Sequence, residues 1–414
     1  MIANPPTQDR YETILADLRS RSLFREIRTI EEVSASSVMI NGSWFVNFAS
    51  NDYLGLSQHP CLRTAAQEAM EKFGLGAGAS PLITGWQSLH EKLRQELATL
   101  KGTENALLFS SGYAAAVGAL SSLVGPGDVI ILDKLVHACI VDGAKLSGAT
   151  IRVFPHNHTE RLKQLLFWAR RNHSDRKILV ATESVFSMDG DLANLAAIVD
   201  LKKEFGALLF VDEAHATGVI GPRGAGLISA LGLVREVDIQ MGTLSKAIGV
   251  SGGFICASQT IIQLLVNRAR SFIYSTASSA PLAAAASASL EILQSDLGDQ
   301  IRERLWQNIR LLWKRLETEK RRPASAIIPI LAGTEEQSLQ LAGMLLENGF
   351  LLPAIRYPTV AKGTARVRVA LSAAHSAEQI EGLATVINGW RSGGSQLVDL
   401  SLGRLTGNRD EKTN

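Results

Sequence analysis

Cysteine is scarce in this sequence. The chain contains three cysteines, Cys61, Cys139 and Cys256, which lie far apart and form no CxxC pair. An odd number of widely spaced cysteines argues against a disulfide framework and against a structural zinc site built on CxxC pairs. The cysteine pattern therefore indicates a reducing compartment.

Long apolar runs are also missing. Residues 1–20 contain Asp, Glu and Arg where a signal peptide has its apolar core, and no later stretch is apolar enough to span a bilayer. The sequence therefore predicts a cytoplasmic protein that has no membrane partner.

Neither sign of charge is in excess. The formal net charge is +2, and Lys and Arg are scattered among Asp and Glu without long basic blocks. A nucleic-acid-binding surface needs a stripe of basic groups that neutralises several phosphates. We therefore expect no nucleic-acid partner.

A phosphate-binding loop for ATP is absent, although residues 212–215 spell DEAH, the tetrapeptide that names a class of helicases. The Walker pattern GxxxxGK[ST] supplies backbone NH groups and a lysine to the phosphates. No Gly in this chain is followed directly by Lys. Without that loop Asp212 and Glu213 have no magnesium nucleotide to act on, so the sequence argues against an ATP-driven motor.

The one HxH pair lacks a third metal ligand. His156 and His158 lie in PHNHTE, among residues that favour loops, and no third ligand is evident. Zinc sites usually supply three ligands with a carboxylate close behind. We therefore predict a surface turn at this segment and no metal site.

The composition that remains suits a globular α/β protein. Hydrophobic residues make up 46% of the chain and charged residues 20%. Since domains usually run to roughly 100 to 200 residues, a chain of 414 residues predicts two or three domains. Continuous apolar runs predict strands of a parallel sheet that is covered on both faces. The runs are VIILD (129–133), KILVATE (177–183), ALLFVDE (207–213) and GGFICAS (252–258).

The pattern of expected helices and strands changes after about Ala283. An Ala-rich and Leu-rich helix leads into an amphipathic helix at 301–322, and strand candidates at 325–331 and 365–371 flank a helix around 339–349. This order predicts a smaller α+β domain. We divide the chain into an N-terminal segment (1–48), a large domain (49–290), a small C-terminal domain (291–400) and a polar tail (401–414).

The spacing between Asp212 and Lys246 predicts a shared site. Lys246 follows Asp212 by 34 positions, and the intervening residues hold a glycine-rich turn, a helix-like stretch and a new strand candidate, DIQMGT. One βαβ crossover takes about this length, so both residues would emerge at the same edge of neighbouring strands. A lysine that faces a carboxylate across a ligand is the pattern of a Schiff-base site for a pyridine cofactor.

Seven segments resemble the α-oxoamine synthase family, a group of fold type I enzymes that depend on pyridoxal 5'-phosphate (PLP). The resemblance runs from about Leu18 to about Ser376. It implies an aspartate aminotransferase-like α/β fold with a mostly parallel sheet. In order, the segments are NFASNDYLGL (47–56), SSGYAA (110–115), ESVFSMDGD (183–191), VDEAHATGVIG (211–221), TLSKAIGVSGG (243–253), IYSTASSAP (273–281) and AIRYPTVAKGTARVRVALSAAH (354–375).

The resemblance implies four catalytic residues. Lys246 would form the Schiff base with PLP and carry the proton of the substrate α-carbon. Asp212 would pair with the pyridinium nitrogen, because its negative charge keeps that nitrogen protonated. His215 would hydrogen-bond the phenolic oxygen of the ring, and His137 would stack on the other face of the ring.

The resemblance also implies a phosphate site. Gly112 and Tyr113 would hold the phosphate at the start of a helix, whose NH groups suit a dianion. Thr243 would add a hydroxyl group, Thr276 would reach the phosphate of the neighbouring subunit in a homodimer, and Ser187 would lie beside the cofactor.

Four further residues are expected to contact substrates. Arg368 would clamp the carboxylate of the amino acid, since a guanidinium fork recognises a carboxylate through two hydrogen bonds. Asn51 lies in the first family segment and is assigned to the same substrate site. Arg25 and Thr359 match positions that touch the acyl substrate in the resembled enzymes, although Arg25 could also be a plain surface charge.

The implied reaction is the decarboxylative condensation of L-alanine with a pimeloyl thioester, carried on coenzyme A or on an acyl carrier protein, in biotin biosynthesis. Two alternatives stay open: another member of the family, such as one that acylates glycine with an acetyl group, and a PLP-binding regulator without turnover. Three departures from the family pattern bear on this choice: Pro81, Ala116, and Ser245 in place of the usual Gly before the lysine.

Overall fold

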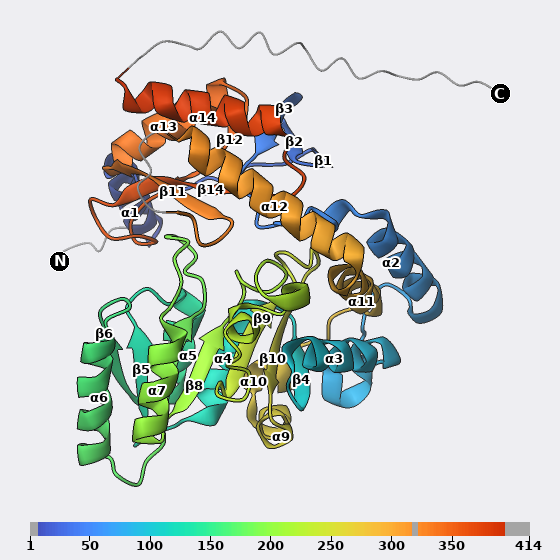
Figure 1. Cartoon of the computed structure of the whole chain (residues 1–414), viewed down its shortest axis with the longest axis vertical. Helices are drawn as coiled ribbons and strands as arrows, with labels where there is room; N and C mark the ends of the chain where they lie inside the picture. Colours follow the sequence, from blue (N-terminus) through green and yellow to red (C-terminus); the bar gives the residue numbers. More distant parts are fainter. Residues whose placement is uncertain (1–6, 317–321, 394–414) are drawn as a thin grey trace.

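The computed structural model describes residues 7–316 and 322–393. Figure 1 shows a large sheet with helices on both sides in one half of the molecule, and a second half in which long helices cover two smaller sheets. The predicted polar tail at 401–414 lies outside the described residues. No helix among the described residues is both long and apolar enough to cross a membrane.

The large sheet contains seven strands in the order β4-β10-β9-β8-β7-β5-β6. The pairs from β9 to β6 are parallel, and β10 is antiparallel to both of its neighbours. The sheet is therefore mostly parallel, which confirms the predicted fold class. The strands are β4 (Asn105–Phe109), β5 (Val129–Asp133), β6 (Thr150–Phe154), β7 (Ile178–Glu183), β8 (Leu208–Asp212), β9 (Ile239–Thr243) and β10 (Gly253–Ala257).

The apolar runs form strands because helices cover both of their faces. Along β5, Val129 and Ile131 pack on one side with helices α6 and α7, while Ile130 and Leu132 pack on the other side with helices α4 and α5. The prediction that GGFICAS is a parallel strand was wrong, since β10 runs antiparallel. The helices of this half are α3 (Ser88–Lys101), α4 (Gly112–Leu123), α5 (Ala138–Ser147), α6 (Thr159–Asn172), α7 (Leu195–Phe205), α8 (Leu227–Ala230), α9 (Gln259–Arg268) and α10 (Arg270–Ile273).

Two long helices connect the halves. Helix α11 (Ala280–Gln294) packs against helices α2 (Pro60–Phe73) and α3, and helix α12 (Asp296–Arg315) crosses above the large sheet (Figure 1). In α12 the predicted apolar face is confirmed, because Ile309 and Leu312 are buried in the core shared with helix α14 (Ala377–Arg391). The helix ends at Arg315, before the predicted end at 322, and residues 317–321 lie outside the described residues.

The second half is an α+β unit. Its three-stranded sheet has the order β11-β14-β13 and is antiparallel throughout. Its elements are β11 (Ile327–Gly333), α13 (Glu335–Glu347), β12 (Phe350–Leu351), β13 (Ala354–Ile355), β14 (Ala365–Ala370) and α14. The strand and helix candidates after Pro323 are thus confirmed.

The N-terminal segment belongs spatially to this second half. Helix α1 (Thr7–Ser20) precedes three short strands, and the third of them pairs in parallel with β12. The segment therefore completes a four-stranded sheet, in the order β1-β2-β3-β12, with a strand from far along the chain. The strands are β1 (Glu32–Ser34), β2 (Ser37–Ile40) and β3 (Ser43–Asn47). The predicted domain limits at 48, 290 and 400 remain predictions.

Candidate active site

A cavity of about 190 Å³ lies at the carboxyl ends of the central parallel strands. In open α/β sheets this edge is where ligands bind, because loops from several strands converge there. The cavity brings together seven of the sequence-predicted site residues and adds several that were not predicted. Its wall is formed by Ser111, Gly112, Tyr113, His137, Cys139, Glu183, Asp212, Ala214, His215, Met241, Thr243, Ser245 and Lys246.

Asp212 and Lys246 lie on adjacent strand ends, as their spacing predicts. Asp212 ends β8, Lys246 follows the end of the neighbouring strand β9, and the two strands pair in parallel. Burial raises the pKa of Asp212, against the lowering effect of the positive charge of Lys246. Burial lowers the pKa of Lys246, against the raising effect of the negative charge of Asp212. The lysine amine therefore gives up its proton more easily than an exposed lysine does.

Glu183, a residue that sequence reasoning missed, supports the position of His137. It ends β7 beside Asp212, and its Oε1 atom accepts a hydrogen bond from the backbone NH of His137 at 2.5 Å. Burial and the nearby charge of Asp212 raise the pKa of Glu183 well above its usual value. His137 begins helix α5 and its ring lines the cavity, where burial lowers the pKa of the imidazole.

His215 belongs to a hydrogen-bonded network that reaches the second half of the molecule. Its Nδ1 atom lies 2.6 Å from the hydroxyl of Tyr53, and burial lowers the pKa of the imidazole well below its usual value. Arg368 donates from Nη2 to the Tyr53 hydroxyl oxygen at 3.2 Å and to Asn51 Oδ1 at 3.0 Å. Tyr53, which lies inside a quoted family segment but was not predicted as a site residue, therefore connects His215 on the cavity wall to Arg368 of β14.

The protonation of His215 follows from this network. The single hydroxyl proton of Tyr53 has two acceptors within reach, Oδ1 of Asn51 at 3.1 Å and Nδ1 of His215 at 2.6 Å, and the shorter distance favours donation to His215. A neutral imidazole with an acceptor at Nδ1 carries its proton on Nε2. His215, which lines the cavity, then has a hydrogen-bond donor for a ligand.

The start of helix α4 forms a cradle beside the cavity. Ser111 caps the helix, and its hydroxyl accepts from the backbone NH of Ala114 at 3.1 Å. A Cβ atom at Gly112 would lie 3.0 Å from Cε of Met241, and one at Gly253 would lie 2.4 Å from the carbonyl carbon of Ser111. Glycine at these positions lets the backbone approach closely, while the first NH groups of a helix lack acceptors within it and favour an anion.

Thr243 and Ser245 lie beside this cradle. The hydroxyl of Thr243 donates to the carbonyl oxygen of Gly252 at 2.8 Å and lies 2.7 Å from the hydroxyl of Ser245. Ser245 lines the cavity, so this departure from the family pattern occurs at the site. Ala116 lies in helix α4 and is buried in the hydrophobic core beside the large sheet. Pro81 lines a different, small pocket together with Thr276.

The other predicted residues lie outside the 190 Å³ cavity wall. The carbonyl oxygen of Ser187 accepts a hydrogen bond from Nε of Arg368 at 2.6 Å, so Ser187 reaches the network described above. Arg25 and Thr359 both line a second cavity of about 810 Å³ between the N-terminal segment and the second half. Thr276 is exposed.

Glu213, the remaining acidic residue of the DEAH segment, points away from the cavity. Its Oε2 atom forms an ion pair with Nζ of Lys101 at 2.7 Å, and both side chains are fully buried. Its Oε1 atom accepts from the backbone NH of Ile228 at 2.9 Å. Glu213 therefore fixes the turn that follows β8.

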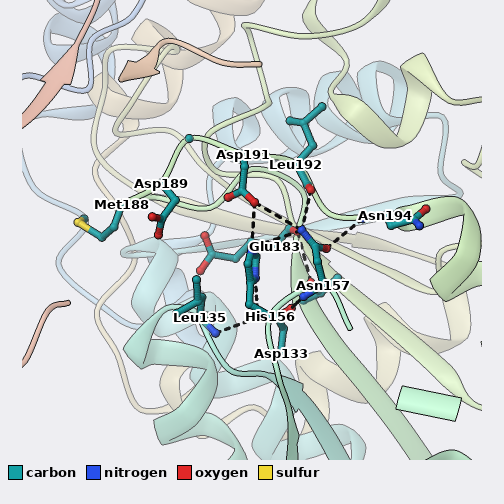
Figure 2. Close-up of polar contacts among 12 residues, drawn as sticks. Asp133, Leu135, His156, Asn157, Glu183, Met188, Asp189, Asp191, Leu192 and Asn194 are labelled. Atoms are coloured by element: carbon teal, nitrogen blue, oxygen red, sulfur yellow. Dashed lines mark hydrogen bonds and ion pairs between the residues drawn. The ribbon is translucent and has the colours of Figure 1, made fainter. Parts of the chain in front are cut away.

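The PHNHTE segment contains a turn at residues 156–157, as predicted, but the side chain of His156 is partly buried. Figure 2 shows its ring between Asp133 and Asp191, and the side chain is only 23% exposed. The prediction missed the two aspartates because they come from other segments of the chain. His158, by contrast, is exposed and caps helix α6.

The cavity fits PLP by the chemistry of its residues. It combines an amine of lowered pKa, a carboxylate at a strand end, two imidazoles and the start of a helix suited to a phosphate. The family model of class I and II aminotransferases matches residues 44–387. The fold and the site thus define a PLP-dependent transferase of fold type I.

Individual relatives narrow the family further. An 8-amino-7-oxononanoate synthase of Geobacter sulfurreducens is 44% identical over 370 residues, which cover 89% of this chain and 94% of that protein. A synthase of the same name from Francisella tularensis has a solved structure with a TM-score of 0.72 and 29% identity, covering 84% of this chain and 98% of that one. The chain belongs to the 8-amino-7-oxononanoate synthase family.

A solved serine palmitoyltransferase is also similar. A lysine-to-alanine variant of the enzyme from S. paucimobilis, with a bound PLP-myriocin aldimine, has a TM-score of 0.87 and 30% identity, covering 94% of this chain and 100% of that one. The fold is therefore shared with enzymes that act on different substrates. Fold likeness by itself does not select the substrate of this chain.

Proposed function

We propose that this chain catalyses the PLP-dependent condensation of L-alanine with a pimeloyl thioester, which yields 8-amino-7-oxononanoate, CO2 and a free thiol for biotin biosynthesis. The observation that carries the proposal is the meeting of Lys246, Asp212, His215 and His137 around one cavity, in a chain that is 44% identical to a synthase of that name. The roles below are assigned on this basis.

Four groups would hold the cofactor. Lys246 would bind it covalently, and Asp212 would pair with its ring nitrogen at the end of β8. His215 would donate from Nε2 to the phenolic oxygen, and the start of helix α4 at Gly112 and Tyr113 would receive the phosphate, together with the hydroxyl of Thr243. When bound, PLP supplies an electron sink that stabilises negative charge at the α-carbon of the amino acid.

Lys246 has the properties of the base that moves the α-proton. Burial lowers the pKa of its amine, so the neutral amine that can accept a proton forms more readily than in an exposed lysine. Asp212 lies on the adjacent strand and opposes this effect by its charge, which keeps the amine basic enough to hold the proton and return it. The ring of His137, which Glu183 holds through the backbone NH, would cover one face of the reacting group.

Arg368 is the proposed site for the carboxylate of alanine. Its guanidinium is buried, but Ser187, Asn51 and Tyr53 accept hydrogen bonds from only two of its three nitrogen atoms. The contacts are made by Nε and Nη2, so the remaining nitrogen, Nη1, can meet a substrate carboxylate. These three partners fix the plane of the guanidinium and so orient the amino acid.

The second cavity is the proposed site for the acyl donor. It contains Arg25, Arg28 and Arg356 with one acidic residue, Glu26, and Thr359 lines the same wall. A basic cavity suits a donor that carries carboxylate or phosphate groups, which both coenzyme A and the phosphopantetheine arm of a carrier protein provide.

We further propose that the protein is a cytoplasmic homodimer. Thr276 is exposed and lies away from the cavity of its own chain, in agreement with a contact to the phosphate of a neighbouring subunit. All three cysteines are free, and two of them are buried, which suits a reducing compartment. Sedimentation would test the dimer, and loss of PLP affinity in a Thr276→Ala variant would test the shared site.

A thiol-release assay tests the reaction. The holoenzyme is given L-alanine, glycine or L-serine with pimeloyl or acetyl thioesters of coenzyme A, and with pimeloyl carrier protein. We expect the fastest release with L-alanine and a pimeloyl donor. A preference for glycine and acetyl-CoA would assign the chain to the acetyltransferases, and no release with any pair would favour a PLP-binding regulator.

A further inference from the structure

The His156 cluster lies one strand away from the cavity and is built from three separate segments (Figure 2). Asp133 ends β5, His156 follows β6, and Asp191 lies in the loop after β7, which we call the 184–192 loop. Nδ1 of His156 lies 3.1 Å from Oδ1 of Asp133, and Nε2 lies 2.9 Å from Oδ2 of Asp191. The cluster thus connects the edge of the large sheet to the loop that contains Ser187.

The contacts require a protonated imidazole. Carboxylates only accept hydrogen bonds, so a ring with a carboxylate at each nitrogen needs a proton on both. Burial lowers the pKa of His156, but the hydrogen bonds and the charges of Asp133 and Asp191 outweigh it and raise the pKa to about 10. Since Oδ1 of Asp191 is buried without a partner among the described residues, the imidazolium is the main cation that offsets the charge of Asp191.

Asn157 adds hydrogen bonds to both β5 and the 184–192 loop. Its Nδ2 atom donates to the carbonyl oxygen of Leu192 at 3.0 Å, and its backbone NH donates to Oδ2 of Asp133 at 3.0 Å. The ring of His156 also packs edge-on against Phe186 of the loop, with 4.3 Å between the ring centroids. Charge, hydrogen bonds and packing therefore all hold the loop from the side of the large sheet.

The opposite side of the 184–192 loop holds the arginines of β14. The carbonyl oxygen of Ser187 accepts from Nε of Arg368, and Asp189 forms an ion pair with Nη1 of Arg366 at 2.6 Å. A Cβ atom at Gly190 would lie 2.2 Å from the carbonyl oxygen of Ile327, so the loop backbone packs directly against β11. The loop is thus the link between the His156 cluster and the guanidinium of Arg368.

We propose that His156 is a positioning residue: its ion pairs with Asp133 and Asp191 fix the 184–192 loop, and the loop holds Arg368 in the orientation that binds the amino acid carboxylate. The inference rests on the proposed function only for the role of Arg368. His156 lines neither cavity and has no expected contact with the cofactor, so its replacement is predicted to weaken amino acid binding without releasing PLP.

The test compares wild-type holoenzyme with His156→Gln and with His158→Gln as a matched control. Glutamine can donate to only one of the two carboxylates and would turn its carbonyl oxygen toward the other. His158 belongs to the same PHNHTE segment but lies exposed at the start of helix α6. The readouts are PLP content, the dissociation constant of alanine from the change in cofactor absorbance without acyl donor, and KM and kcat for alanine.

We expect His156→Gln to raise the dissociation constant and KM by about tenfold, to keep PLP content and to change kcat at saturating alanine much less, while His158→Gln matches the wild type. An unchanged dissociation constant in a stable His156→Gln holoenzyme overturns the proposal. So does a loss of PLP that accounts for the whole defect.

A second variant covers a failure of His156→Gln to fold. Asp191→Asn removes the carboxylate that faces Nε2 of His156 and keeps the imidazole, and it should weaken alanine binding in the same direction by about threefold. A wild-type dissociation constant in this variant would contradict the proposal. If the wild type binds another amino acid and not alanine, the proposed function fails, and the same comparison is made with that amino acid, because Arg368 would meet any amino acid carboxylate.

Discussion

Two lysines lie near the two neighbouring carboxylates of the DEAH segment, and their surroundings differ. Lys101 is fully buried and donates three hydrogen bonds, to Glu213, to Thr217 and to the carbonyl oxygen of Ala225. Lys246 is partly buried on the wall of the cavity, near Asp212. No hydrogen bond of its amine is found within residues 7–316 and 322–393.

The difference separates a structural ion pair from a reactive one. A buried ammonium that donates all three of its protons is held in one place. An amine that is buried without hydrogen-bond partners has a lowered pKa, so it can act as a nucleophile and accept a proton. Asp212 and Glu213 are adjacent residues of one tetrapeptide, but Asp212 faces the reactive lysine and Glu213 forms a buried ion pair that stabilises the fold.

The largest expected effect is the loss of the reactive lysine. Lys246→Ala should lower kcat by at least about 10³-fold, because a general base and the covalent bond to the cofactor are both removed. Borohydride treatment of wild-type holoenzyme, followed by peptide mapping, should label Lys246 only. Label on Lys101, or comparable activity in the variant, would contradict the assignment.

The next effect concerns Lys101 and appears in stability. Lys101→Met leaves Glu213 as a buried charge without its cation, and it should lower the free energy of unfolding by about 3 to 5 kcal/mol in urea denaturation. Lys101→Met combined with Glu213→Gln should recover part of this loss, since glutamine can still accept from the backbone NH of Ile228.

Lys92 provides a matched control for Lys101. It pairs with Glu291 at 3.0 Å, but both side chains are more than half exposed. Lys92→Met should therefore change the free energy of unfolding by at most about 1 kcal/mol. Equal losses for Lys92→Met and Lys101→Met would show that burial does not distinguish the two pairs.

The sequence predicts residues of the site well where one short segment carries them. Asp212, His215 and Lys246 lie in two such segments, one crossover apart, and the structure brings them to one cavity. The sequence could not reveal the contact between Tyr53 and His215, because 162 positions separate these residues. Contacts of that kind depend on how the two halves of the molecule pack against each other, and this packing cannot be predicted from a single sequence.

The apolar pattern of a strand also does not show whether the strand runs parallel or antiparallel to its neighbours. A central antiparallel strand and a parallel one are equally buried, so GGFICAS looks like its neighbours. The connection from β9 to β10, residues 244–252, is shorter than the dozen or so residues that a parallel crossover needs. Loop length, rather than hydrophobicity, therefore predicts the antiparallel pairing.

His156 sharpens the comparison, because it is a third cation beside carboxylates and has one carboxylate at each ring nitrogen. The groups that face it are Asp133 from β5 and Asp191 from the 184–192 loop. Its pKa rises from 6.5 when unfolded to about 10 when folded, so its contribution to stability is complete below pH 6.5 and is lost as the pH rises through about 10.

The unfolding free energies of wild type and His156→Gln should therefore differ most near pH 6 and converge toward pH 10, by on the order of 2 kcal/mol. Asp191→Asn removes one of the two carboxylates, so the fall in stability should begin at a lower pH in that variant. A difference between wild type and His156→Gln that stays constant from pH 6 to pH 10 would mean that the imidazole is neutral in the folded protein. Such a ring could donate to only one aspartate, and the 184–192 loop would then be held by Asn157 and by packing against Phe186.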